Sequence, residues 1–300
     1  MNDSNQKLVH TLGWFSLVNL GIFIQASLSL SILGLDGYLS QYGISMLEIS
    51  LGVAGIGVFG ALVMILASKP IICLFLKPTS AKNSKDTKVQ QLRLIVEIQA
   101  EKADIPVPSL AVYSSEEINA FAIGTGGRHS MLVVSQKLLD SLSLDELSAV
   151  VGHELTHIAN GDMLTLTLIQ GVVNMCVHFP AHILGQLFDR LVFRDPHRAP
   201  VTRAISIILQ LLLAGLASLV VMWFSRQREF TADVGGAKLA GHGEMMAALR
   251  SLQTDVDTEP SMYPFVVFGM NSHILHGSLL RYFSSHPSIQ ERIQALAKVQ

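Results

Sequence analysis

The stretch GHELTHIANGDMLTLTLIQGVVNMCVHF, residues 152–179, joins a metal-binding pattern directly to a long apolar run. In its first part, His153 and His157 are four positions apart, and Glu154 follows the first histidine. This spacing places both imidazoles on one face of a helix, one turn apart, where they can bind a single zinc ion. Glu154 then lies beside the open coordination position and not on the metal. The stretch therefore predicts water-consuming chemistry close to a membrane.

The residues around this pattern predict the helix that carries it. Ser143 is followed three positions later by Glu146, which is a capping box at a helix start. Gly161 is a natural helix stop. We expect one helix between these signals, with both histidines on it.

Composition indicates a membrane protein. Of the 300 residues, 50% are hydrophobic and only 15% are charged, against about 25% charged residues in an ordinary soluble domain. The net charge of -2 gives no reason to expect nucleic acid as a partner. The chain has two cysteines, both in apolar runs, so any metal site must use histidines and carboxylates.

Four stretches without Asp, Glu, Lys or Arg approach the ~20 residues that a bilayer core requires. They are residues 14–33, 49–67, 163–187 and 205–224. We interpret the first as a retained membrane anchor, not a signal peptide. The third contains polar residues that suit a cavity-lining helix, and whether it crosses the membrane or only dips into it is left open.

Basic residues predict the orientation. The segment 36–48 has none, whereas seven follow the second apolar run, so the positive-inside rule places the following region in the cytoplasm. The connection between the third and fourth runs conflicts with this rule, because it holds four arginines: Arg190, Arg194, Arg198 and Arg203. Either this hairpin crosses against the rule, or it enters the membrane partly from the cytoplasmic side.

We therefore predict four parts of the chain. Residues 1–76 form two transmembrane helices, and 77–162 form the first part of a catalytic domain, with short strands near 110–113, 119–123 and 131–135. Residues 163–224 form a membrane hairpin. Residues 225–300 form a helical second part of the catalytic domain.

A catalytic zinc ion needs a third protein ligand and an open position. Three carboxylates compete. Asp162 lies half a turn round from the imidazoles unless Gly161 redirects the chain. Glu229 and Asp233 are one helical turn apart, which suits one ligand and one acceptor for an imidazole N–H. We prefer Glu229 as the ligand, and an even number of membrane crossings returns it to the side of the histidines.

Three motifs carry a family resemblance: HELTHIANGD at 153–162, REFTAD at 228–233 and NAFAIG at 119–124. With the four apolar runs in their order, they resemble the HtpX family of bacterial membrane zinc metalloproteases, which is related to the CAAX prenyl endopeptidases among the gluzincin peptidases. The resemblance covers essentially the whole chain. It implies an α-helical integral membrane protein with four apolar spans and a mainly helical gluzincin-type zinc metalloprotease domain that carries a small β-sheet.

The resemblance also implies residue roles. One Zn²⁺ ion per chain would be bound by His153, His157 and Glu229. Glu154 would be the general base, Asp233 would support the site, and His286 would stabilise the oxyanion. The sequence departs from the family pattern twice: Ile123 stands where Thr is expected, and Ser288 where a second Pro is usual. The second departure lies two positions after His286.

We expect peptide hydrolysis, with substrate bound as an extended strand along Asn119, Ala120, Phe121, Ala122 and Ile123. The resemblance implies a stress-response enzyme of the bacterial inner membrane that degrades misfolded or damaged membrane proteins at the cytoplasmic face and cooperates with other membrane quality-control proteases. Two alternatives are an intramembrane zinc protease and a non-enzymatic membrane metal-binding protein.

Overall fold

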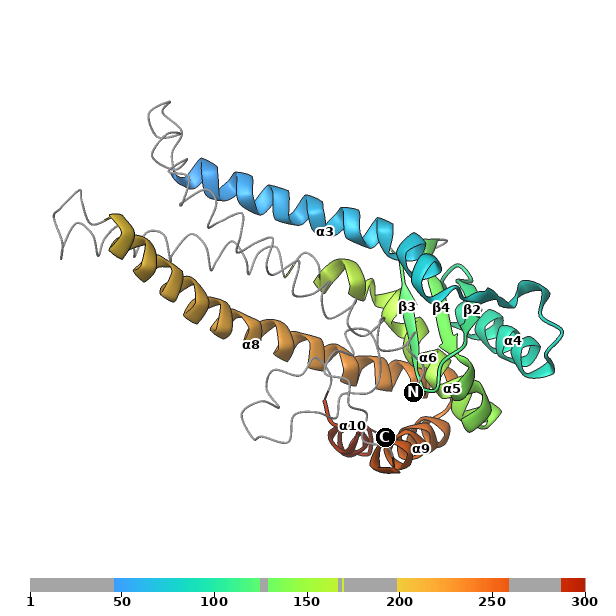
Figure 1. Ribbon diagram of the computed structural model, residues 1–300. Helices are drawn as coiled ribbons and strands as arrows, with labels where there is room; N and C mark the ends of the chain where they lie inside the picture. Colours follow the sequence, from blue (N-terminus) through green and yellow to red (C-terminus); the bar gives the residue numbers. More distant parts are fainter. Residues whose placement is uncertain (1–45, 125–128, 167–168, 170–198, 259–286, 300) are drawn as a thin grey trace. The chain divides into compact units, whose positions relative to one another are not determined.

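The structure is a computed structural model that describes residues 46–124, 129–166, 169, 199–258 and 287–299 (Figure 1). The chain divides into two compact units. One unit contains Met64–Thr165 and Met222–Gln300, and it holds every site residue discussed below. The other contains the first part of the long helix α3 and the part of helix α8 up to Val221.

The described elements are mainly helical. Their bounds, in chain order, are α3 Met46–Leu76, β1 Thr79–Ser80, η1 Ala81–Asn83, α4 Thr87–Lys102, β2 Ser109–Tyr113, β3 Ala120–Ile123, β4 Met131–Ser135, α5 Gln136–Ser141, α6 Leu144–Asn160, α8 Ala199–Ala240, α9 His242–Thr258 and α10 Ile289–Leu296. The three predicted strands are confirmed. Strand β1 was not predicted, because its two residues lie in a polar segment that shows no strand pattern.

The four strands form one mixed sheet in the order β1-β2-β4-β3. Strands β2 and β4 are parallel, whereas β1 and β3 pair antiparallel with their neighbours. Strand β3 therefore lies at an edge of the sheet, next to the helix α6 that carries the histidines.

Both faces of the sheet are covered, so every residue of β3 and β4 is buried, and burial does not alternate along these strands. On one face, Ala122 and Leu132 join a large core with α4, α6, α9 and α10. On the other face, Phe121 and Val133 pack against Ile72 near the end of α3. The sheet thereby holds β3 rigidly beside α6.

Helix α6 begins and ends where the sequence predicts. Ser143 and Glu146 form the reciprocal hydrogen bonds of a capping box. At the other end, Gly161 adopts a left-handed conformation with φ of 66°, which ends the helix and turns the chain.

Close approach of α8 to α6 depends on glycines. A Cβ atom on Gly152 would lie 3.1 Å from the Cα of Gly236, and one on Gly236 would lie 3.0 Å from the main-chain nitrogen of His153. Gly235 meets the side chain of Thr156 in the same way. Because these glycines have no side chain, the backbones of α6 and α8 pack closely. This packing brings the acidic residues of α8 to the histidines of α6.

Among the residues that the structure describes, no helix combines the length and hydropathy of a membrane span. The predicted spans at 49–67 and 205–224 lie within helices α3 and α8. The predicted span at 14–33 and most of that at 163–187 lie outside the described residues. The four-span organisation stays a prediction.

Candidate metal centre

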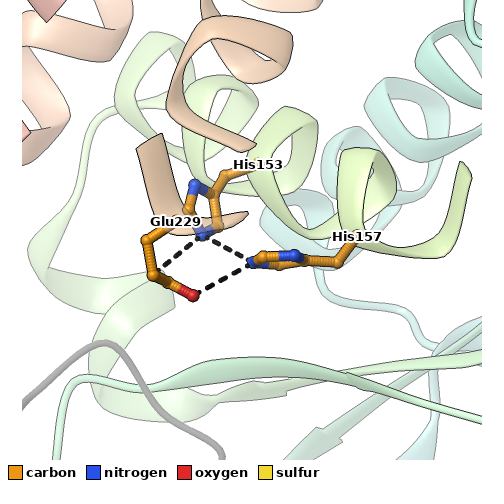
Figure 2. Close-up of side chains that lie close together, drawn as sticks. All are labelled: His153, His157 and Glu229. Carbon is orange, nitrogen blue, oxygen red and sulfur yellow. Dashed lines mark hydrogen bonds and ion pairs between the residues drawn. The ribbon is translucent and has the colours of Figure 1, made fainter. Parts of the chain in front are cut away.

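Three side chains from two helices converge on one point (Figure 2). Nε2 of His153 and Nε2 of His157 lie 3.1 Å apart. A carboxylate oxygen of Glu229 lies 3.6 Å from the first of these nitrogens, and its other oxygen lies 3.4 Å from the second. The structure thus brings together the histidine pair and the preferred third carboxylate, from α6 and α8.

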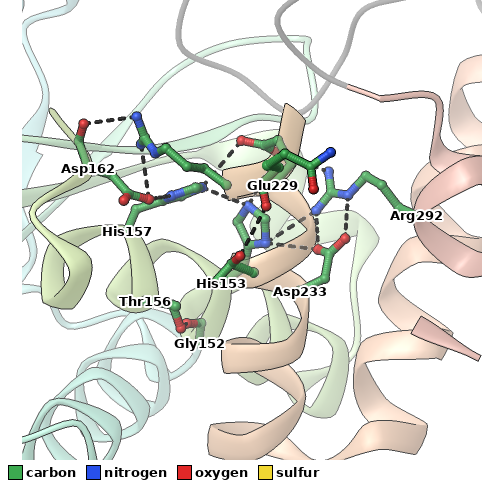
Figure 3. Close-up of polar contacts among 11 residues, drawn as sticks. Gly152, His153, Thr156, His157, Asp162, Glu229, Asp233 and Arg292 are labelled. Carbon is green, nitrogen blue, oxygen red and sulfur yellow. Dashed lines mark hydrogen bonds and ion pairs between the residues drawn. The ribbon is translucent and has the colours of Figure 1, made fainter. Parts of the chain in front are cut away.

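The far nitrogen of each imidazole contacts an aspartate (Figure 3). Nδ1 of His153 lies 3.0 Å from Oδ1 of Asp233, and Nδ1 of His157 lies 2.5 Å from Oδ2 of Asp162. Ionised carboxylates only accept hydrogen bonds, so both Nδ1 atoms carry the proton and donate it. In the neutral form of each ring, Nε2 then carries a lone pair, and these lone pairs face each other and Glu229.

This donor set fits a zinc ion. Tetrahedral coordination with bonds of ~2.0–2.1 Å separates ligand atoms by roughly 3.3 Å. The two Nε2 atoms lie 3.1 Å apart, and each has a different oxygen of Glu229 near it, at 3.6 Å from His153 and 3.4 Å from His157. Two imidazole lone pairs and a carboxylate directed at one point also require a cation between them. Asp162 is not part of this group of ligand atoms, because the turn at Gly161 directs it to Nδ1 of His157 instead.

The pKa values show that the site favours positive charge. Burial opposes protonation of His157, but hydrogen bonds to Asp162 and Glu229 outweigh it and raise its pKa to about 10. Burial and the nearby Arg292 likewise oppose protonation of His153, yet the hydrogen bonds to Asp233 and Glu229 raise its pKa. Either protons or a metal ion can supply this positive charge, so the two compete.

Glu154 is buried, with 5% of its surface exposed. Burial raises the pKa of its carboxyl group, partly opposed by the neighbouring histidines and by a hydrogen bond with the main chain of Ala122. A carboxylate with a raised pKa is suited to take up a proton during a reaction and release it again. Glu154 therefore lies near both histidines and is hydrogen-bonded to the edge strand β3.

Strand β3 directs alternate main-chain groups to the side that faces away from β4. Ser135 donates its main-chain N–H to the carbonyl of Asn119, and Asn119 donates its main-chain N–H to the side-chain Oγ of Ser135. Along an antiparallel pair of strands, hydrogen-bonded and non-hydrogen-bonded residue pairs alternate. The main-chain groups of Phe121 and Ile123 therefore point to β4, whereas those of Ala120 and Ala122 point away from it. Asn119 itself precedes the strand, which begins at Ala120.

Sequence reasoning missed Arg292. Its guanidinium donates to both carboxylate oxygens of Asp233, from Nε at 2.8 Å and from Nη2, and its Nη1 lies 3.6 Å from Glu229. Only 1% of its surface is exposed. The spacing of Ile289, Arg292 and Leu296 places this arginine on the apolar face of α10, and that pattern is the signal that could have identified it.

Arg228 is a second arginine of the site. Its Nη2 lies 3.0 Å from Oδ2 of Asp162, and its Nη1 donates to the main-chain carbonyl of the same residue at 2.9 Å. His286, the predicted oxyanion-stabilising residue, lies outside the described residues.

Comparisons with known proteins agree with this geometry. Residues 86–300 match the sequence profile of Peptidase family M48. "Protease HtpX homolog" of Nitrosomonas eutropha is 42% identical over 287 residues, which cover 94% of this chain and 97% of that protein. "Protease HtpX" of Pseudoalteromonas atlantica is 37% identical over 287 residues, covering 95% of this chain and 98% of that protein.

The crystal structure of S. mikatae Ste24p superposes with a TM-score of 0.61 at 19% sequence identity, covering 95% of this chain and 66% of that one. At this identity the likeness shows the fold alone. The family resemblance, by contrast, is confirmed by the sequence comparisons, and with it the prediction of an enzyme. The chain belongs to peptidase family M48 and is a metalloendopeptidase.

Proposed function

We propose that this metalloendopeptidase uses one zinc ion, bound by His153, His157 and Glu229, to cleave membrane proteins that are misfolded or damaged. Ligand atoms of these three residues converge near the buried carboxyl group of Glu154, and this convergence supports the proposal. Three protein ligands leave a fourth position for water, which is the arrangement of a catalytic and not a structural zinc site.

A zinc ion held by His153, His157 and Glu229 would act as a Lewis acid that activates water and polarises the scissile carbonyl. Glu154 accepts the proton of the attacking water and delivers it to the nitrogen of the leaving amine. Burial raises the pKa of this carboxyl group, which favours uptake of the proton. Asp233 and Asp162 hold the two imidazoles by Nδ1, so that Nε2 of each ring stays directed at the metal position.

The substrate chain extends along β3 and adds to the sheet as a further strand. The main-chain groups of Ala120 and the carbonyl of Ala122, which face away from β4, would take part in this pairing, while the N–H of Ala122 bonds to Glu154. Binding through the main chain accepts many sequences, which suits an enzyme that removes damaged proteins. Because Ala122 also contacts Glu154, a peptide on this edge lies beside the general base.

Membrane attachment is supported by the apolar surface of the long helices. Ile208, Leu212, Leu216 and Val220 of α8 are each more than half exposed, and their spacing of four residues places them along one side of the helix. Phe59 and Leu66 of α3 are each 69% exposed. Lipid would cover such side chains. The excess of basic residues after α3 favours the cytoplasmic face of the bacterial inner membrane for the active site.

The surroundings of α6 favour a site at the membrane surface over one within the bilayer. Helix α6 contacts α4, α9 and the sheet, and its start carries Asp145 and Glu146. Polypeptides held in the bilayer are then the substrates within reach. Cooperation with other membrane quality-control proteases is proposed from the family resemblance alone.

Zinc content and proteolysis, measured together on the full chain in detergent or liposomes, test this function. We expect one zinc ion per chain and cleavage of an unfolded membrane protein. Glu154→Gln should bind zinc as the wild type does and lose roughly 10²–10⁴-fold in rate, because proton transfer is removed and the ligands are kept.

Two outcomes would overturn the proposal. Equal cleavage by the wild type and Glu154→Gln would remove Glu154 from the reaction. Zinc bound with no cleavage of any unfolded substrate, together with zinc flux in vesicles, would favour a membrane metal carrier.

A further inference from the structure

We propose that Arg228 and Arg292 are positioning residues of the metal centre, and that each holds the aspartate that orients one of the two histidines. The site is then built from two parallel chains of side chains, each running from an arginine through an aspartate to an imidazole. This inference rests on the proposed zinc site.

The first chain runs through Arg292, Asp233 and His153 (Figure 3). The guanidinium binds both oxygens of the carboxylate, and Oδ1 in turn lies 3.0 Å from Nδ1 of the imidazole. Nη2 of Arg292 also lies 3.2 Å from this Nδ1, so the arginine contacts the ring directly as well. All three residues are 1% exposed. A planar guanidinium that binds both oxygens fixes the plane of the carboxylate, and thereby the direction from which it accepts the imidazole N–H.

The second chain runs through Arg228, Asp162 and His157. Here the guanidinium uses one nitrogen for the carboxylate and another for the main-chain carbonyl of the same aspartate. These two contacts fix both the side chain and the backbone of Asp162, which directly follows the left-handed turn at Gly161. The side chain of Arg228 is 14% exposed, so this chain lies closer to the surface than the first.

The arginines are needed because both aspartates are buried, with 5% of Asp162 and 1% of Asp233 exposed. A buried carboxylate that loses its cationic partner is strongly destabilised, and its side chain reorients toward other donors. The imidazole then loses the acceptor that fixes its ring, and Nε2 is no longer held on the metal position. Loss of such a supporting contact typically weakens metal binding by about 10–100-fold.

Helix α8 links the two chains. Within one and a half turns it supplies Arg228 to the second chain, Glu229 as the metal ligand and Asp233 to the first chain. Helix α10 supplies Arg292. The orientation of both histidines of α6 therefore depends on the register of α8.

The test uses the full chain in detergent and compares Arg228→Gln and Arg292→Gln with the wild type. Zinc affinity is measured by competition with a chromophoric chelator, and unfolding is followed without metal. We expect each variant to bind zinc about 10–100-fold more weakly. Substitution by lysine should restore part of the affinity, because an ammonium group keeps the charge but lacks the planar fork. The visible spectrum of the cobalt-loaded protein should shift in both glutamine variants, since it reports ligand geometry.

A double-mutant cycle separates positioning from a general structural effect. In an Asp162→Asn background, Arg228→Gln should change zinc affinity by no more than about two-fold, because its partner is already lost. In an Asp233→Asn background, Arg228→Gln should weaken zinc binding as much as it does in the wild type. Equal effects in the two backgrounds would overturn the inference.

Arg93→Gln is the matched control, because Arg93 pairs with Glu97 on the surface at 3.2 Å, with both side chains 44% exposed. It should leave zinc affinity unchanged. A wild type that binds no zinc would overturn the proposed function and this inference together. A wild type that binds zinc and cleaves, with folded Arg228→Gln and Arg292→Lys both binding zinc as tightly as it does, would overturn the inference alone. These two variants also decide the question if Arg292→Gln does not fold.

Discussion

Asp233 accepts a hydrogen bond from Nδ1 of His153 at 3.0 Å, while Nε2 of the same ring faces the metal position. Burial opposes ionisation of this aspartate, but the ion pair with Arg292 outweighs it and lowers its pKa to about 2. The carboxylate is therefore ionised throughout the physiological range and can only accept. This fixes the tautomer of His153 that binds metal.

Asp233→Asn should therefore weaken zinc binding by about 10–100-fold while the chain still folds. An amide is similar in shape, but its nitrogen can donate to Nδ1 and so favour the wrong tautomer. Competition with a chelator measures the change in affinity, and circular dichroism checks the fold. An affinity equal to that of the wild type would show that the contact does not orient the ring.

The local part of the site could be predicted from sequence, because it depends on contacts within one helix. The spacing of His153 and His157, and the capping box at Ser143, are set by helical geometry alone. The prediction of Glu229 as the third ligand required one further assumption, that the segment around Glu229 returns to the histidines. It was preferred because Asp233 follows it by one turn.

The remaining contacts could not be predicted, because they join residues far apart in the chain. Arg292 contacts His153 across 139 positions, and Arg228 contacts Asp162 across 66. The position of Asp162 depends on the left-handed turn at Gly161. Helical geometry alone places Asp162 half a turn away from the imidazoles, and the sequence does not show whether Gly161 redirects the chain. The glycines of α8 matter only once its partner helix is known.

Gly236→Ala should destabilise the domain and weaken zinc binding. Its Cβ would lie 3.0 Å from the nitrogen of His153 and 3.2 Å from the carbonyl oxygen of Ala149, both main-chain atoms that cannot move independently of α6. We expect a loss of about 1–3 kcal/mol in the free energy of unfolding, measured by thermal denaturation. Gly243→Ala is the control, because a Cβ there meets no atom within 4 Å. Equal melting temperatures for the two variants would contradict the close packing.

Tyr113 should make stability depend on pH in the alkaline range. Burial raises the pKa of its hydroxyl from 10.0 to about 12, despite hydrogen bonds with Asn119 and Ser115 that act in the opposite direction. A raised pKa in the folded state means that this contribution to stability is complete below about pH 10 and is lost as the pH rises to about 12. The full difference corresponds to about 2–3 kcal/mol.

Comparison with Tyr113→Phe isolates this effect, because phenylalanine does not ionise. The stability of the variant relative to the wild type should increase between about pH 9 and about pH 11.5. Melting temperatures of both proteins at the two pH values provide the measurement. A constant difference between them would show that the hydroxyl ionises in the folded state as it does in the unfolded chain.

Removal of zinc should lower the stability of the wild type, because the metal binds only the folded arrangement of α6 and α8. If free zinc is at ~100 times its dissociation constant, the stabilisation is about 2.7 kcal/mol. Glu229→Gln keeps the shape of the third ligand but loses its charge, so its melting temperature should respond much less to added zinc. Asp140→Asn is the control, since this exposed carboxylate contacts Gln136 on α5 and lies outside the site. Should Glu229→Gln gain as much stability from zinc as the wild type does, Glu229 would not be the third ligand.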